Sequence, residues 1–145
     1  MPSHNIKQVV PLFMVTNMQA SLEFYIKGIG FEMTNSWLPD GKIRWCWLQL
    51  GGAAFMLQEY IESMQPSAEE KQYLGKGTSI NFICDDALAI YHDVLSRGLS
   101  PKEPFVGNNF WVLHLTDPDG YHIFFESLTD VPEETMYSDW MKAKN

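Results

Sequence analysis

Hydrophobic and polar residues alternate most clearly in two short runs near the C-terminal end of the chain, residues 110–116 and 121–126. The tetrad between them, Asp117-Pro118-Asp119-Gly120, is typical of a turn, because Pro fixes φ, Gly tolerates a positive φ and Asp side chains bond nearby amides. The pattern therefore predicts a β-hairpin. Side chains alternate faces along a strand, so the second run has an apolar face and a mixed one. The apolar face is typical of core and carries Tyr121, Ile123 and Phe125; the mixed face is typical of a cavity wall and carries His122, Phe124 and Glu126.

In the first strand of the hairpin, His114 alternates with Leu113 and Leu115. It is therefore expected to point away from the core, toward the same side as His122. A simpler interpretation of each His is an ordinary strand residue that faces solvent or is hydrogen-bonded in place.

Helical spacing occurs twice in the chain, over residues 18–27 and 87–97. Asn17 can cap the first helix and Asp85 or Asp86 the second, while Gly30 and Gly98 follow their ends. Residues 17 and 30 lie 68 positions before residues 85 and 98, which indicates an internal duplication. Strand-like runs surround both helices, at residues 9–15, 31–38, 43–50, 53–60, 79–84 and 99–106, followed by the hairpin.

The sequence thus predicts an α+β fold of two βαβββ repeats, which form a curved, cup-like mixed sheet with the helices outside. The repeats span residues 6–60 and 78–127, and residues 61–77 form a linker with one or two helical turns. Together they make a single domain, residues 6–127. The C-terminal tail, residues 128–145, is expected to form a short helix capped by Thr129 or Asp130, or to pack loosely.

Composition restricts the class of partner. The formal net charge of −8 argues against nucleic-acid binding, which needs Lys and Arg on phosphates, and suits a cationic ligand. Cys46 and Cys84 lie in apolar runs and are expected to be buried free thiols in a reducing compartment. There is no apolar signal core and no run long enough to span a membrane. A cytoplasmic protein with no membrane partner is therefore expected.

Several segments in this order resemble the vicinal oxygen chelate superfamily, which includes glyoxalase I, extradiol dioxygenases, fosfomycin-modifying enzymes and bleomycin resistance proteins. The resemblance covers residues 6–127 and lies in Ser21–Tyr25 followed by Gly30-Phe31, in Leu48–Gly52, and in Asp117–Tyr121 with Phe125-Glu126. It implies a concave sheet that carries a ligand site.

The metalloenzymes of that superfamily bind a divalent ion through His and Glu side chains at four positions. In this chain those positions correspond to Val10, Met56, Ser79 and Phe124, none of which is a good metal ligand. The resemblance therefore favours a member with no metal and no cofactor. Bleomycin resistance proteins similarly lack these ligands and are acidic homodimers that sequester a drug, so a homodimer is expected here.

Strand parity around these positions predicts the residues that line the cup. The expected ligand-binding residues are Leu12, Trp45, Trp47, Met56, Gln58, Asn81, His114, His122, Phe124 and Glu126. Trp45 and Trp47 alternate with Cys46 and Leu48, and they could instead fill the core or a dimer interface. Trp111 alternates with the cavity set and is expected in the core.

The sequence therefore favours a metal-independent small-molecule binding protein of the bleomycin-resistance-like type, which sequesters a cationic or aromatic ligand. An alternative is a metal-dependent lyase, isomerase or dioxygenase with His114, His122 and Glu126 as ligands, since two His and a carboxylate can form a facial triad. A third is an interaction module whose cup is filled by its own aromatic residues or by the tail around Trp140. The sequence identifies neither a catalytic residue nor the ligand.

Overall fold

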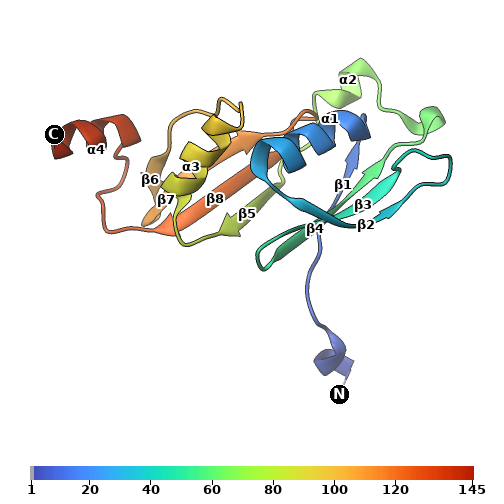
Figure 1. Ribbon diagram of the computed structural model, residues 1–145, viewed down its shortest axis with the longest axis horizontal. Helices are drawn as coiled ribbons and strands as arrows, with labels where there is room; N and C mark the ends of the chain where they lie inside the picture. The colour runs from blue at the N-terminus through green and yellow to red at the C-terminus, as the bar shows by residue number, and fades with distance from the viewer. Residues whose placement is uncertain (1) are drawn as a thin grey trace.

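The computed structural model describes residues 2–145 and contains two four-stranded sheets (Figure 1). The N-terminal sheet consists of β1 (Leu12–Val15), β2 (Glu32–Trp37), β3 (Trp45–Leu50) and β4 (Ala53–Glu59), in the order β1-β4-β3-β2. The C-terminal sheet consists of β5 (Ser79–Ile83), β6 (Phe105–Gly107), β7 (Phe110–Thr116) and β8 (His122–Leu128), in the order β5-β8-β7-β6. The identical strand order, with one parallel pair in each sheet, confirms the predicted α+β fold of two βαβββ modules.

Each module carries its helix on the side of the sheet nearest the viewer in Figure 1. In the N-terminal module α1 (Met18–Leu22) continues into the π-helical segment η2 (Glu23–Ile29), and in the C-terminal module the helix is α3 (Ala87–Ser96). As predicted, Asn17 accepts a hydrogen bond from the Ala20 N–H. Of the two cap candidates of the second helix, Asp86 does the same for the Ala89 N–H. These local bonds satisfy helix N–H groups that have no partner within the helix.

The linker, for which one or two helical turns are predicted, contains two short helical segments, η3 (Glu62–Met64) and α2 (Ala68–Lys71). A capping box starts α2: Ser67 accepts from the Glu70 N–H, and the Glu70 carboxylate accepts from the Ser67 N–H.

The larger hydrophobic core contains buried residues of both modules, and a smaller one lies under the C-terminal tail. Phe82 of the C-terminal module lies 5.6 Å from Phe31 and 6.3 Å from Phe55 of the N-terminal module, between ring centroids. Tyr121 stacks on Phe13 at 4.1 Å, and its hydroxyl donates to the Met14 carbonyl.

The turn of the predicted hairpin joins the modules as well. Asp119 accepts hydrogen bonds from the N–H and the hydroxyl of Thr16. Asp117 is buried and accepts from the Tyr25 hydroxyl at 2.8 Å. On its other oxygen it accepts from the N–H groups of Asp119 and Tyr121. Both acidic side chains of this turn are therefore structural.

The C-terminal tail ends in helix α4 (Tyr137–Lys144), which packs on the C-terminal module. Trp140 lies edge-on to the buried Trp111, with the ring centroids 5.3 Å apart, and Tyr137 hydrogen-bonds His92. Neither predicted cap residue begins this helix: its N-cap is Met136, which bridges to Phe105 of β6. Tertiary contacts, rather than a local cap, therefore fix where α4 starts.

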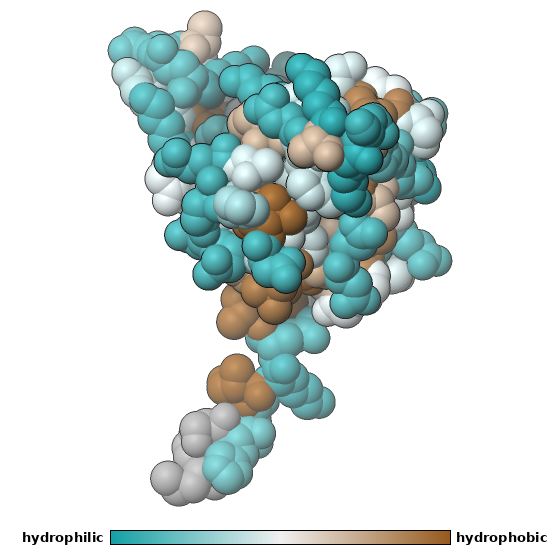
Figure 2. Space-filling model, turned by 90° about the vertical axis from the view of Figure 1, so that its left-hand side faces the viewer, coloured by the Kyte–Doolittle hydropathy of each residue, from teal (hydrophilic) through white to brown (hydrophobic). Residues whose placement is uncertain are grey.

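Residues 6–10 form an arm that connects the short 3-10 helix η1 (Pro2–Asn5) to the strand β1. This arm extends away from the rest of the protein in Figure 2. Its Ile6 and Val9 side chains are largely exposed. Within residues 2–145, none of the helices has the length and apolar character that a membrane crossing requires.

Candidate functional site

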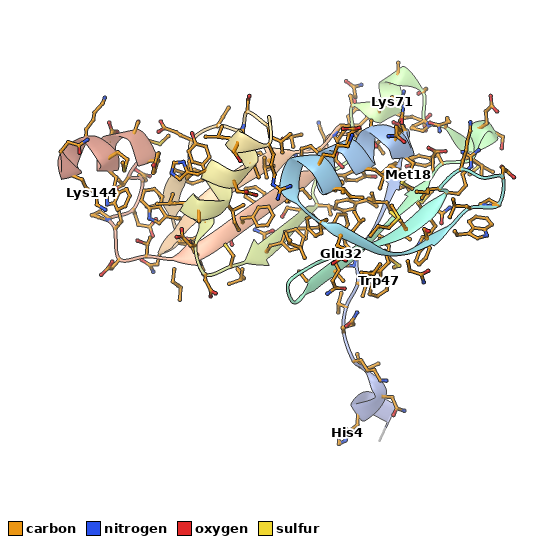
Figure 3. All side chains as sticks on the ribbon, in the orientation of Figure 1. His4, Met18, Glu32, Trp47, Lys71 and Lys144 are labelled. Atoms are coloured by element: carbon orange, nitrogen blue, oxygen red, sulfur yellow. The ribbon has the colours of Figure 1, made fainter. Side chains whose placement is uncertain are left out.

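The side of the N-terminal sheet that faces away from α1 is lined by large side chains; we call it the aromatic face. Trp45 and Trp47 of β3 lie on it, because Cys46 and Leu48, which alternate with them, are fully buried on the helix side. Figure 3 shows Trp47 below β3, away from α1. Strand register places Met56 beside Trp47, Gln58 beside Trp45, and Leu12 beside Met56. All five residues predicted from this module therefore share one half-open surface.

A third tryptophan joins this surface. Trp37 of β2 pairs with Trp45 across the β2–β3 ladder, so it lies on the same face, and its side chain is 53% exposed. The prediction from sequence missed it because the register shifts between Met33 and Asn35 and because seven residues separate the two strands. The alternation of residues within β2 alone does not show on which face of the sheet Trp37 lies.

A cavity of about 520 Å³ opens at the end of the aromatic face, which is a typical volume for a small-molecule site. Its lining includes Trp37, Gln58 and Tyr60, together with the ion pair of Arg44 with Glu59. A second cavity of about 560 Å³ borders the same ion pair on the helix side, next to Met18.

The open side of the C-terminal sheet carries the other predicted residues; we call it the His face. Register places Phe124 between Asn81 of β5 and His114 of β7, while His122 lies between Ser79 and Thr116. Glu126 lies beside Ile83, which is 68% exposed. The apolar alternating residues Ile123 and Phe125 are buried on the helix side, as the pattern predicts.

Side-chain contacts organise the His face into two groups. His114 stacks on Phe124 at 4.5 Å between centroids, and its Nε2 lies 2.9 Å from Nδ1 of His122. Further along the strand, the Asn81 amide donates to Glu126 at 3.2 Å. Partial burial, with smaller contributions from His122 and Lys102, lowers the pKa of His114 below its ordinary value. The neutral form of His114 is therefore favoured near pH 7.

The alternative metal triad is not assembled by this arrangement. Phe124 separates His122 from Glu126 along β8, and Glu126 is bonded to Asn81. Across residues 2–145, no three His, Cys, Asp or Glu side chains lie close enough together to hold a metal ion. The resemblance maps the superfamily's four metal-ligand positions onto Val10, Met56, Ser79 and Phe124. Strand register places Leu12 beside Met56 and Asn81 beside Phe124. None of these six residues supplies an imidazole, a carboxylate or a thiolate.

The predicted cup is divided between two surfaces. The aromatic face and the His face belong to separate sheets that share no strand pairing. Each face is nevertheless open, and each carries five of the ten predicted residues. Trp111, predicted as core, is buried under α4.

Several known structures share this architecture. TnmS3, an antibiotic binding protein from Streptomyces sp. CB03234, superimposes with a TM-score of 0.63 and 22% identity over 87% of this chain and 100% of its own. A glyoxalase/bleomycin resistance protein from Catenulispora acidiphila DSM 44928 gives 0.61 and 21% over 88% and 100%. TioX from Micromonospora sp. ML1 gives 0.62 and 17% over 85% and 99%.

The chain has the glyoxalase/bleomycin resistance fold. This result agrees with the resemblance to the vicinal oxygen chelate superfamily that the sequence motifs indicate. No family model matches the sequence, and no curated protein matches it either. At these identities the glyoxalase/bleomycin resistance fold is common to the compared structures, while ligands and residue roles are specific to each protein.

Proposed function

We propose that this protein binds a small aromatic or cationic molecule on its aromatic face, without a metal ion, in the manner of a bleomycin resistance protein. The observation that carries the proposal is the cluster of Trp37, Trp45 and Trp47 on one half-open surface beside a cavity of about 520 Å³. Monomeric proteins rarely leave such aromatic surface open without a use for it.

The chemistry of the aromatic face suits a flat ligand. Indole rings bury a large area against an aromatic system, and their faces attract cations. Met14 and Met56 add flexible, polarisable contacts next to the rings. Gln58 supplies a polar group for orientation, and the net charge of −8 attracts cationic molecules over a longer range.

A homodimer is part of this proposal. In a single chain the aromatic face and the His face are both open, and they leave Leu12, Trp37, Ile83 and Leu128 between 43% and 77% exposed. A second copy that places one face opposite the other would cover these side chains and enclose a ligand between them. Sedimentation equilibrium should then give twice the 16.7 kDa chain mass. A concentration-independent monomer would contradict this part of the proposal.

Thermal unfolding in the presence of a ligand panel tests the binding function. The panel contains planar aromatic, cationic aromatic and glycopeptide compounds, each with and without EDTA. A ligand at about 100 times its Kd stabilises the folded state by about 2.7 kcal/mol. The proposal predicts such a shift for at least one aromatic compound, and the same shift with EDTA present.

Two variants localise the effect. Trp47→Leu should abolish the shift, while Tyr73→Leu removes an exposed aromatic residue from the linker and should leave it unchanged. No shift with any compound, a shift that EDTA removes, or equal shifts in both variants would contradict the proposal.

A further inference from the structure

The two histidines of the His face form a hydrogen-bonded pair that leaves one N–H donor free when both rings are neutral and two when one ring is protonated. With Nε2 of His114 at 2.9 Å from Nδ1 of His122, one ring donates and the other accepts. The remaining ring nitrogens, Nδ1 of His114 and Nε2 of His122, have no hydrogen-bond partner in the part of the chain that the structure describes. Stacking on Phe124 holds the His114 ring in place.

A cavity of about 530 Å³ is lined by His114 of this pair. Besides His114, its lining includes Lys102 and Ser100 from the segment after α3, Thr116 from β7, and Phe24 from η2. Lys102 forms no ion pair with any described residue, whereas Lys27, Arg44 and Arg97 each have a carboxylate partner. Its charge is near enough to contribute to the lowered pKa of His114.

The carboxylates near the cavity are already engaged elsewhere. Asp117 accepts three hydrogen bonds, from Tyr25 and from two backbone N–H groups. Glu103, the neighbour of Lys102, accepts from the N–H and the hydroxyl of Ser138 in α4. Asp119 is bonded to Thr16, and Glu126 to Asn81. In a chain with a net charge of −8, this corner therefore keeps a lysine and two imidazoles without an acidic partner.

We propose that the His face binds the acidic group of an aromatic ligand, with Lys102 supplying the charge and the His114–His122 pair supplying hydrogen bonds. The group is a carboxylate or another oxyanion, and the ring that carries it lies against Phe24, which lines the same cavity as His114 and Lys102. Charge-assisted hydrogen bonds to such an oxyanion are stronger than neutral ones. The inference rests on the proposed function, because it assigns the charged end of the same kind of aromatic ligand.

Two isosteric probes separate charge from aromatic contact: 1-naphthoate, which carries a carboxylate, and 1-naphthamide, which is neutral. Isothermal titration of the wild-type protein should give about tenfold tighter binding of the naphthoate, the factor expected for one charge-assisted contact. Lys102→Met should remove most of this preference and leave the naphthamide Kd within about twofold. The control Lys71→Met, in exposed α2, should leave both Kd values unchanged.

The pH dependence gives a readout that a structural role would not produce. The charged and titratable groups around His114 are His122 and Lys102, and Asp117 lines the same cavity. Naphthoate affinity should fall as pH rises through the titration of His114, whose pKa lies below its ordinary value, because deprotonation removes a positive charge and an N–H donor. Naphthamide affinity should not change, and His114→Phe should remove the pH dependence.

Each outcome decides one of the two proposals. Equal affinity of the two probes, or a naphthoate preference that survives Lys102→Met, overturns the acid site while naphthamide binding still supports the proposed function. Failure of both probes to bind overturns the acid site. A naphthoate preference that depends on Lys102 supports the acid site whether or not Trp47→Leu changes it, and the thermal shift of the Trp47→Leu variant decides the aromatic face separately.

Discussion

The hydroxyl of Tyr25 provides a sharp test of how the two modules are held together. It donates at 2.8 Å to Oδ2 of Asp117, and Tyr25 and Asp117 are 0% and 5% exposed. The two backbone N–H groups that bond Asp117 both contact Oδ1, so Tyr25→Phe leaves Oδ2 buried without a donor. The ring itself stays packed against Phe24, Phe31 and Phe55. The substitution therefore isolates one hydrogen bond.

The expected cost follows from the charge of the acceptor. A hydrogen bond to a charged group contributes about 1.5–3 kcal/mol. We expect Tyr25→Phe to lose this much unfolding free energy at pH 7, or roughly 3–12 °C in Tm, at about 2–4 °C per kcal/mol for a chain near this length. Urea unfolding followed by circular dichroism measures it. Tyr91→Phe is the matched control, because the Tyr91 hydroxyl has no hydrogen bond within residues 2–145.

The loss of unfolding free energy in Tyr25→Phe should depend on pH in a definite direction. Burial raises the pKa of Asp117, and the hydrogen bond from Tyr25 opposes that rise. A group with a raised folded pKa contributes stability below its unfolded pKa, near 3.9 for Asp, and loses it as pH rises through the folded value. Without the hydroxyl, ionised Asp117 is less stable, so the deficit of Tyr25→Phe should grow from pH 4 to pH 7. Wild-type stability at pH 7, or a deficit equal at both pH values, would refute this reasoning.

Two further substitutions test the packing of the chain. Gly75→Ala should lower the free energy of unfolding by more than about 2 kcal/mol, because φ is +79° and a Cβ would clash with the Gly120 carbonyl oxygen. The control Gly77→Ala has a similar φ of +74° but no atom within 4 Å of its Cβ, so it should cost only about 1–2 kcal/mol. Equal losses of unfolding free energy in urea would contradict the clash. Trp140→Ala should release α4 from Trp111, so hydrogen exchange should accelerate over residues 137–144 while β3 and β4 stay protected; unchanged protection of α4 would show that other contacts hold it.

Much of the fold could be predicted because its signals are local. The turn Asp117–Gly120 and the alternation around it gave β7 with the bounds that the structure has, Phe110–Thr116. The two capped helices at a fixed separation revealed the duplication. The same alternation placed Trp45 and Trp47 opposite the buried Cys46 and Leu48.

Other features depend on contacts that no local pattern encodes. The spacing predicts an ordinary helix over residues 18–27, whereas Glu23–Ile29 is π-helical and continues past that end. Gly28 in this segment packs so closely on Leu99 that a Cβ would lie 2.9 Å from that side chain. The strand expected over residues 99–106 is limited to Phe105–Gly107, because Pro101 and Pro104 cannot donate to a ladder.

The residues of the candidate site likewise include some that local patterns predict and some that only contacts between segments reveal. Parity correctly grouped residues within each strand, but it could not show that Trp37 opposes Trp45 across a shifted register. Nor could it show that Lys102, in an irregular segment, lies beside His114. Both facts follow from pairing and packing between segments, and both add a residue to a proposed ligand surface.

The most direct test of the binding surface is the set of indole N–H signals in a ¹⁵N-correlated NMR spectrum during ligand titration. The five tryptophans serve as built-in reporters, assigned by single Trp→Phe variants. Three of them lie on the aromatic face. Trp140 belongs to α4, and Trp111 lies beneath it in contact with Trp140. With a compound that raises the Tm, the proposal predicts saturable shifts of Trp37, Trp45 and Trp47, while Trp111 and Trp140 stay unchanged. Shifts confined to Trp111 and Trp140, or no shift of any indole at saturation, would contradict it.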